Sequence, residues 1–336
     1  MIWYKQKNDN DIVVSTRIRL ARNLTKYPFP NAMNPETAKK ACTEIQKAIL
    51  ESNSTLANDF NLYKIDGISP IEKTVLAEKH LISRELTEKP EACVMVSKDE
   101  SMSIMLMEED HIRIQVIMGG LKLDEAFETA SRVDDVIDEN VQYAFDKDFG
   151  YLTSCPTNTG TGMRASVMMH LPALTMTDNI SRIISSASNL GIAVRGLYGE
   201  GSKAYGNLYQ ISNQVTLGLT EKEIIEKVKN IVSQIAEHEK EARKKLLENN
   251  KNYIENKVWR SYGILKYARS IDSKEAKALI SDVIMAKNMG IINDIKENLT
   301  ELEILTEPAS IEADSAKRLT PEERDIRRAE LIRSKL

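Results

Sequence analysis

The strongest constraint on the fold is a change in sequence pattern near Thr220. Before it, several short segments alternate apolar and polar residues or are wholly apolar, which is typical of strands: 92–97, 103–108, 111–118 and 164–171. From Ile224 to Ile235, apolar residues recur every three or four positions, and little beyond them resembles a strand. We therefore expect an α+β fold with mostly antiparallel strands, followed by an all-α region.

Other segments refine this division. Apolar spacing predicts helices over 124–141 and 179–190, and Thr220 with Glu223 forms a capping-box pattern. Segments 192–201 and 206–215 are typical of a strand, a glycine-rich loop and a second strand. The Lys- and Glu-rich stretch 237–257 indicates a connection between domains. We expect a catalytic domain over 1–240 and a helical domain over 241–336, with no internal repeat.

Composition excludes several classes of protein. The 336 residues suggest about two domains. The formal net charge of −4 disfavours a protein held mainly by the nucleic-acid backbone. No apolar run approaches the about 18 residues of a membrane span, and the N-terminus lacks a signal-peptide core. Three distant cysteines, Cys42, Cys93 and Cys155, predict no disulfide framework or zinc site and hence a reducing, cytoplasmic location.

The first motif that could carry chemistry is STRIRLAR at 15–22. Arg17 and Arg19 are two residues apart, so on an extended segment they share one face. Two guanidinium groups on one face suit a polyphosphate. The alternative is a solvated basic edge strand.

The second motif is MEEDHIR at 107–113. It places Glu108, Glu109 and Asp110 beside His111 and Arg113 at the junction of two expected strands. Such carboxylates can hold a cation or act as a base. The alternative is an acidic turn.

The third motif is CPTNTGTGMRASV at 155–167. Its Gly- and Thr-rich loop can offer backbone N–H groups to an anion, but it lacks the lysine of a P-loop. The alternative is a tight turn beside a buried strand.

Together with RGLYGEG at 195–201, these motifs resemble the catalytic domain of phosphagen (guanidino) kinases, over about residues 12–245 and in the same order. The resemblance implies an antiparallel sheet flanked by helices and a kinase that uses ATP and Mg²⁺. It implies that five arginines bind phosphate: Arg17, Arg19, Arg113, Arg164 and Arg195. It also implies nucleotide contacts along their segments and at His80, including Ser15, Thr16, Ile18, Ala165, Ser166, Val167, Met168, Gly196, Leu197, Tyr198, Gly199 and Glu200.

The same resemblance assigns the catalytic roles. Glu109 and Glu200 match the two carboxylates that bind the guanidinium substrate, and Cys155 matches the reactive cysteine. We expect a thiolate that orients the substrate without forming a covalent intermediate. No residue is expected to ligate the metal directly; Glu108 would face magnesium through water.

A fourth motif lies near the end of the chain. Only 14 residues precede Ser15, where small-molecule phosphagen kinases carry a helical domain, and RDIRRA occupies 324–329. This resembles the RDxxRA motif of bacterial protein arginine kinases of the McsB type, which forms a phosphoarginine pocket. The implied pocket comprises Arg324, Asp325, Ile326, Arg327, Arg328 and Ala329. On a helix, Arg324 and Arg328 would share a face and grip the phosphoryl group, while Asp325 would accept from the guanidinium.

The combined resemblance implies a protein arginine kinase in bacterial stress response. Its implied substrates are a stress-response repressor and damaged proteins marked for a Clp protease, its implied partner is a zinc-binding activator protein, and its implied state is a homodimer. One alternative is a phosphagen kinase acting on free arginine, and another is a non-catalytic regulator that reads phosphoarginine. A DNA-binding role for the tail is disfavoured, because residues 308–336 hold seven Lys or Arg against six Asp or Glu.

Overall fold

A computed structural model describes residues 2–6, 12–52, 54–196, 204–315 and 318–336. Contacts between Cα atoms divide the chain into two compact units. The first unit comprises 1–6, 15–166 and 212–229, and the second comprises 7–14, 167–211 and 230–336.

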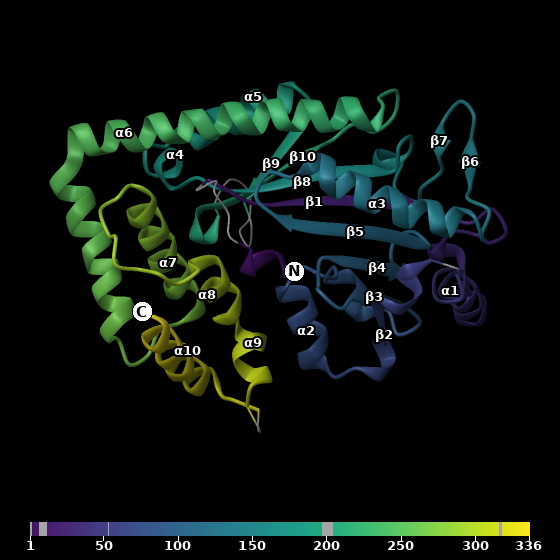
Figure 1. The fold of residues 1–336 in the computed structure, drawn as a ribbon, viewed down its shortest axis with the longest axis horizontal. Helices are drawn as coiled ribbons and strands as arrows, with labels where there is room; N and C mark the ends of the chain where they lie inside the picture. Colours follow the sequence, from purple (N-terminus) through teal and green to yellow (C-terminus); the bar gives the residue numbers. More distant parts are fainter. Residues whose placement is uncertain (1, 7–11, 53, 197–203, 316–317) are drawn as a thin grey trace. The chain divides into compact units, whose positions relative to one another are not determined.

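The first unit is built on an antiparallel sheet (Figure 1). Its strands are hydrogen-bonded in the order β2-β3-β4-β5-β1, and the first half of β8 follows β1. Their bounds are β1 (Val13–Arg22), β2 (Phe60–Lys64), β3 (Cys93–Ser97), β4 (Met102–Leu106), β5 (Ile112–Gly119) and β8 (Met163–His170). In the β1–β5 register, Arg19 lies opposite Gln115 and Ala21 opposite Arg113. This register brings two of the sequence motifs onto neighbouring strands.

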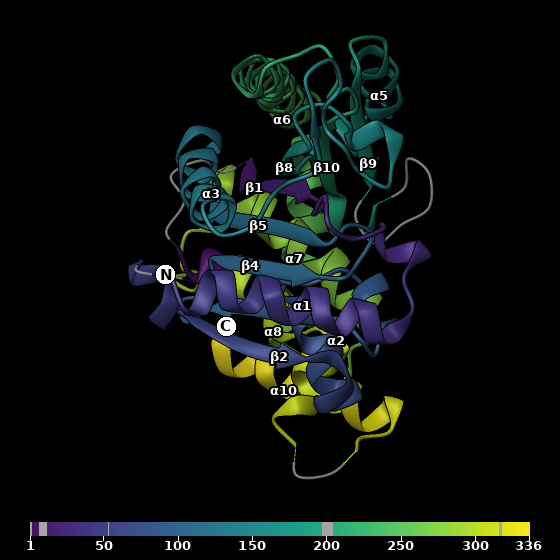
Figure 2. The same ribbon diagram turned by 90° about the vertical axis from the view of Figure 1, so that its right-hand side faces the viewer.

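Helices pack on this sheet. The first unit contains α1 (Pro35–Leu50), α2 (Pro70–Glu78), α3 (Leu123–Asp138) and a small hairpin of β6 (Phe145–Asp146) and β7 (Gly150–Tyr151). Helix α3 lies beside β5 (Figure 2) and also contacts α1. Its buried residues include Ala126, Ala130, Val133 and Ile137. Asn34 caps α1, and Ser69 with Glu72 forms a capping box at α2. Neither of these two helices was predicted from the sequence.

Short 3-10 helices complete both units. They are η1 (Trp3–Lys5), η2 (Pro30–Ala32), η3 (Thr55–Asn58), η4 (Ile65–Gly67), η5 (Glu85–Glu88), η6 (Pro156–Asn158) and η7 (Tyr205–Asn207). Of these, η6 directly follows Cys155 and fixes the path of its loop.

The second unit combines the end of β8 with β10 and β9, in that order, and a set of helices. The bounds are β9 (Ile192–Gly196), β10 (Leu208–Asn213), α4 (Pro172–Met176), α5 (Ile180–Asn189), α6 (Glu221–Tyr267), α7 (Ser273–Asn288), α8 (Leu299–Leu305), α9 (Pro308–Ala313) and α10 (Pro321–Lys335). The end of β10 and the start of α6, up to residue 229, belong to the first unit. The expected domain boundary at residue 240 falls inside α6, whose helical backbone is interrupted at Asn250. In the described part of the chain, no helix is both long and apolar enough to cross a bilayer.

The structure confirms the expected strands and helices. The predicted segments correspond to β3, β4, β5, β8, β9 and β10 and to α3 and α5. The capping box at α6 is present, since the Thr220 N–H donates to Glu223 and the Glu223 N–H donates to Thr220. The long apolar face after Thr220 therefore belongs to a helix, as its spacing predicted.

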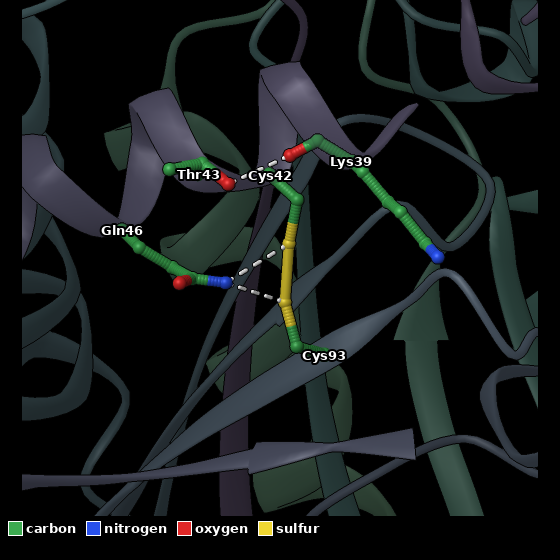
Figure 3. Close-up of a disulfide and its surroundings, with 5 residues drawn as sticks. All are labelled: Lys39, Cys42, Thr43, Gln46 and Cys93. Carbon is green, nitrogen blue, oxygen red and sulfur yellow. Dashed lines mark hydrogen bonds between the residues drawn. A yellow bond between two sulfur atoms is a disulfide. The ribbon is translucent and has the colours of Figure 1, made fainter. Parts of the chain in front are cut away.

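The prediction that the cysteines form no disulfide is wrong for Cys42 and Cys93. These residues, from α1 and β3, form a disulfide, and Gln46 Nε2 lies 3.1 and 3.0 Å from their sulfur atoms (Figure 3). They are 51 residues apart in sequence, so only the packing of α1 on the sheet brings them together. Cys155 is a free thiol.

Candidate active site

Three neighbouring strands bring arginines together in the first unit. Arg113 comes from β5, Arg17 and Arg19 from β1, and Arg164 from β8. Arg17 and Arg19 share one face of β1, while Ile18 and Leu20 are buried on the other. The spacing of STRIRLAR therefore has the effect that the sequence predicted.

Positive charge is concentrated around Arg19. Burial is the largest cause that lowers the pKa of the Arg19 guanidinium well below its usual range. The charges of neighbouring arginines lower it further: Arg17, Arg113 and Arg164. Arg19 Nε is buried and makes no hydrogen bond to the described residues. Concentrated positive charge of this kind favours a polyanion such as a triphosphate.

A hollow of about 180 Å³ (the site hollow) is lined by residues of the first three sequence motifs. It lies wholly within the first unit. Its lining residues are Arg19, Ala21, Glu109, Arg113, Cys155, Thr157, Asn158, Gly162 and Arg164. A carboxylate, a thiol and three guanidinium groups thus surround one space of small-molecule size.

The two adjacent glutamates have different environments. Arg113 forms ion pairs with both, at 3.0 Å to Glu109 Oε2. Glu108 is also held by Ser83 Oγ at 2.5 Å, and its side chain is 4% exposed, whereas that of Glu109 is 39% exposed. Glu109 is therefore the carboxylate that can meet a substrate. Glu108 mainly fixes Arg113.

Cys155 lies in a tightly fixed loop. Its Sγ is 3.0 Å from Thr157 Oγ1, and Thr153 Oγ1 donates to the Cys155 carbonyl at 2.8 Å. The preceding N–H, of Ser154, donates to Asp110 Oδ1 at 2.7 Å. The loop thus presents the thiol to the site hollow from a defined backbone position.

A buried clamp holds this loop. Asp110 is fully buried, and its Oδ1 also accepts from Asn23 Nδ2 at 2.6 Å. Asn23 Nδ2 in turn donates to the Leu152 carbonyl, and Asn23 Oδ1 accepts from the His111 N–H. The sequence places Asp110 in an acidic cluster but does not indicate this role, because Asn23 and Ser154 come from distant segments.

Arg22, the third arginine of STRIRLAR, is structural. It pairs with Asp134 at 2.7 Å, donates to the Thr161 carbonyl at 3.1 Å and lies 3.5 Å from the centre of the Tyr151 ring. Gly162, with a φ of +63°, lies so close that a Cβ there would be 2.6 Å from Arg22 Nη1. The glycine is therefore required for this loop to approach β1.

Other predicted nucleotide-binding residues contribute to the frame of the site. Their side chains are buried: Ser15, Thr16, Ile18, Ala165, Ser166, Val167 and Met168. Thr16 Oγ1 donates to the Gly120 carbonyl, and Ser166 Oγ donates to the Arg17 carbonyl. His80 follows α2, and its ring centre lies 5.9 Å from that of Trp3. None of these eight described residues lines the site hollow.

The remaining predicted catalytic segment belongs to the second unit. Arg195 and Gly196 end β9, and Arg195 is exposed. Leu197, Tyr198, Gly199 and Glu200 lie outside the described residues. The role of Glu200 as the second substrate carboxylate stays a prediction.

The RDIRRA motif lies on α10, also in the second unit. Arg328 is 1% exposed and donates to the Thr306 and Ile271 carbonyls at 2.8 and 2.9 Å. It also pairs with Asp325 at 2.6 Å. These contacts direct the Arg328 guanidinium into the protein in this structure, whereas the sequence analysis expected it to grip a ligand.

The other residues of the motif differ in exposure. Arg324 donates to Glu312 at 3.2 Å and to the Leu319 carbonyl at 3.1 Å. Ile326 is 46% exposed, Arg327 pairs with Glu330 on the surface, and Ala329 is buried. The phosphoarginine pocket stays a prediction.

Two family models match the chain. One is the ATP:guanido phosphotransferase C-terminal catalytic domain, over residues 41–242, and the other is the protein-arginine kinase McsB C-terminal domain, over 251–336. A protein-arginine kinase from Geobacillus sp. (strain WCH70) is 49% identical over 99% of this chain and 93% of its own length. One from Bacillus subtilis (strain 168) is 48% identical, again over 99% of this chain and 93% of its own length.

The chain belongs to the protein-arginine kinase family. Its fold is that of guanidino kinases more broadly. The crystal structure of lombricine kinase aligns with a TM-score of 0.61 and 24% identity, over 69% of this chain and 67% of that one. The sequence-based identification of the fold and of the family is thereby confirmed. Glu109, Arg113, Cys155 and Arg164 lie within the residues that match the catalytic-domain model, whereas Arg17 and Arg19 precede them.

Proposed function

We propose that the protein transfers the γ-phosphoryl group of ATP to the guanidinium of arginine side chains in proteins, and that the site hollow is where this transfer occurs. The observation that carries the proposal is the meeting of Glu109 and Cys155 with Arg19, Arg113 and Arg164 around one space. The first two suit a cationic acceptor, and the three arginines suit an anionic donor. A phosphotransferase needs both on opposite sides of the reacting phosphorus.

The acceptor guanidinium must lose a proton when it attacks phosphorus. A guanidinium has a pKa above about 12, and its protonated nitrogen carries no free electron pair for attack on phosphorus. Glu109, partly exposed at the site hollow, can hold the cation by two N–H groups and take the proton as the P–N bond forms. In our proposal Glu200 holds the other edge. Cys155 orients the guanidinium from the loop fixed by Asp110.

The donor side is electrostatic. Arg19 is close enough to Arg17, Arg113 and Arg164 for their charges to lower its pKa, and phosphate oxygens would relieve that repulsion. Magnesium on the nucleotide would neutralise further charge. The ion would be carried by ATP. Glu108, which was expected to face it through water, is buried and paired with Arg113, so it does not suit that role in this structure. Fixed arginines then stabilise the transferring group without reorganisation.

Two observations favour a protein acceptor over free arginine. The C-terminal family model spans 251–336, and relatives named protein-arginine kinase match 99% of the chain. The test is transfer of labelled phosphate to an unfolded protein and to free arginine at equal arginine concentration. We expect labelling of the protein at a kcat/KM at least about a hundredfold higher, a difference of about 3 kcal/mol. Equal values would favour the phosphagen kinase alternative.

Partners and location follow from the resemblance as further proposals. We propose a cytoplasmic homodimer in stress response, acting on a repressor and on damaged proteins destined for Clp proteolysis, with a zinc-binding activator. Exposed apolar residues on the second half of α6 support self-association: Tyr253, Trp259, Ile264 and Tyr267. Light scattering of Trp259→Glu beside the wild type tests the dimer. A wild-type monomer at micromolar concentration would contradict it.

We also propose that RDIRRA binds phosphoarginine and raises activity. The exposed Ile326 and Arg327 leave one side of the motif open to a ligand. Titration of free phosphoarginine into wild type, Asp325→Ala and Arg327→Ala tests this. We expect loss of binding in Asp325→Ala, with thermal unfolding showing whether release of Arg328 also destabilises α10. Equal binding in all three proteins would contradict the pocket.

A further inference from the structure

A second, larger hollow lies at the end of α3, beside the β6–β7 hairpin (the hairpin hollow). Its volume is about 590 Å³, and it belongs to the first unit. It is lined by Asp138, Glu139, Asn140, Val141, Gln142, Tyr143, Phe145 and Tyr151. None of these eight described residues contributes to the site hollow. The hairpin hollow is therefore unused by the mechanism above.

The charged residues around the hairpin hollow are acidic and lie at the C-terminus of α3, where acidic residues are unfavourable. The C-terminus of a helix is the negative end of its dipole and favours basic residues, yet the last turn of α3 contains none. Exposed acidic residues stand there instead: Asp135, Asp138 and Glu139. Burial, followed by the charge of Asp134, raises the pKa of Asp138. A cationic group from outside the chain would offset the negative charge of these carboxylates and of the helix terminus.

Exposed aromatic rings border the same hollow. Phe145, which lines the hollow, is 60% exposed, and Phe149, in the turn of the hairpin, is 55% exposed. The Phe145 and Tyr151 rings meet edge to face at 5.2 Å, and Arg22 already stacks on Tyr151 from within the protein. Exposed aromatic surface beside carboxylates suits the guanidinium and ammonium groups of a protein partner, together with apolar side chains.

The hairpin continues directly into the catalytic loop. The Leu152 N–H donates to the Ala144 carbonyl at 2.9 Å, and Tyr151 forms a bridge with Gly160. Cys155 is only four positions after Tyr151 in the sequence. Their Cα atoms are thus within about 14 Å of each other. An extended segment with an arginine at Cys155 would place residues about four positions away near the hairpin hollow.

We propose that the hairpin hollow is a docking surface for basic stretches that flank the acceptor arginine in a protein substrate. This rests on the proposed function, because it assumes a protein acceptor. Charge complementarity identifies the occupant: a nucleotide would be repelled, and so would the same acidic hollow of a second copy in a symmetric dimer. Docking of this kind selects among arginines by their surroundings.

The experiment separates docking from chemistry. The probes are unfolded, carboxymethylated lysozyme and the same protein with its lysines succinylated, which keeps the arginines but reverses the lysine charges. Binding is measured without ATP by fluorescence anisotropy of the labelled probes. Transfer is measured with ATP on both probes and on acetylarginine amide. The enzymes are wild type, Asp138→Lys/Glu139→Lys and, as a control on the same helix, Glu125→Lys/Glu128→Lys.

We expect wild type to bind the basic probe about tenfold more tightly than the succinylated one, and Asp138→Lys/Glu139→Lys to lose this preference. The KM of Asp138→Lys/Glu139→Lys for the basic probe should rise about tenfold, while its kcat and its transfer to acetylarginine amide stay unchanged. The control should behave as wild type. Equal binding of both probes by wild type, equal losses in both double variants, or a change of oligomeric state specific to Asp138→Lys/Glu139→Lys would overturn the proposal. Normal docking without transfer to any probe would instead refute the proposed function alone.

Discussion

Removal of the Asp110 carboxylate should disable catalysis without removing any group that lines the site hollow. Asp110 Oδ1 accepts from Asn23 Nδ2 at 2.6 Å and from the Ser154 N–H at 2.7 Å, and the residue is fully buried. Asp110→Ala leaves both donors unsatisfied. At about 1.5–3 kcal/mol for each of the two hydrogen bonds to this charged group, the unfolding free energy should fall by about 3–6 kcal/mol.

The catalytic effect follows from the position of the loop. The freed Ser154 no longer fixes the backbone next to Cys155, and a displacement of about 1 Å at a reacting group costs about a hundredfold in rate. We expect kcat to fall about a hundredfold, with the Kd for an ATP analogue unchanged, because the arginine cluster comes from the strands. Asp110→Asn keeps an acceptor oxygen and should recover most of the rate. Stopped assays at 15 °C, a temperature at which the variants stay folded, measure kcat, and calorimetry measures the Kd for the ATP analogue. A folded Asp110→Ala with normal kcat would refute the clamp.

Further predictions concern binding, pH and redox state. Arg17→Ala and Arg164→Ala should each weaken binding of an ATP analogue by at least about tenfold in calorimetry, since a hydrogen-bonded charge pair is lost; unchanged affinity would contradict the phosphate role. Burial raises the pKa of Glu303 to about 8, so the folded state holds its proton, and stability should fall as pH rises from about 4.5 to 8. Between pH 6 and 8.5, the fall in the free energy of unfolding should be about 2–4 kcal/mol smaller in Glu303→Gln than in the wild type, as chemical unfolding would measure. An unchanged pH dependence would contradict this assignment to Glu303. Denatured but unreduced protein should show one thiol, and three after reduction if Cys42 and Cys93 are bonded. Three thiols before reduction would contradict the disulfide.

The sequence was sufficient where function depends on local spacing. Alternation predicted that Arg17 and Arg19 share a face of a strand, and the structure confirms it. The chemistry of MEEDHIR was predicted as a cluster, but which glutamate is accessible depends on Arg113 and Ser83. Pattern alone gives no such contact.

Long-range partners could not be predicted for the same reason. Asn23 meets Asp110 across 87 residues, and Arg22 meets Asp134 across 112. Helix spacing placed Arg328 on the face of Arg324, but packing of α10 against Thr306 and Ile271 turns its guanidinium inward. Such side chains find their partners only when distant elements pack.

The most direct test of the central claim is phosphoarginine mapping in a mixed proteome. The protein is incubated with ATP and a bacterial extract, and peptides are analysed by mass spectrometry under non-acidic conditions that preserve the P–N bond. Glu109→Gln serves as the matched control, because it keeps the size of the side chain but lacks the base. Arginine kinase activity predicts phosphoarginine on many proteins with the wild type and at least about a hundredfold less with Glu109→Gln. Equal signals from both proteins, or phosphorylation of free arginine alone, would contradict it.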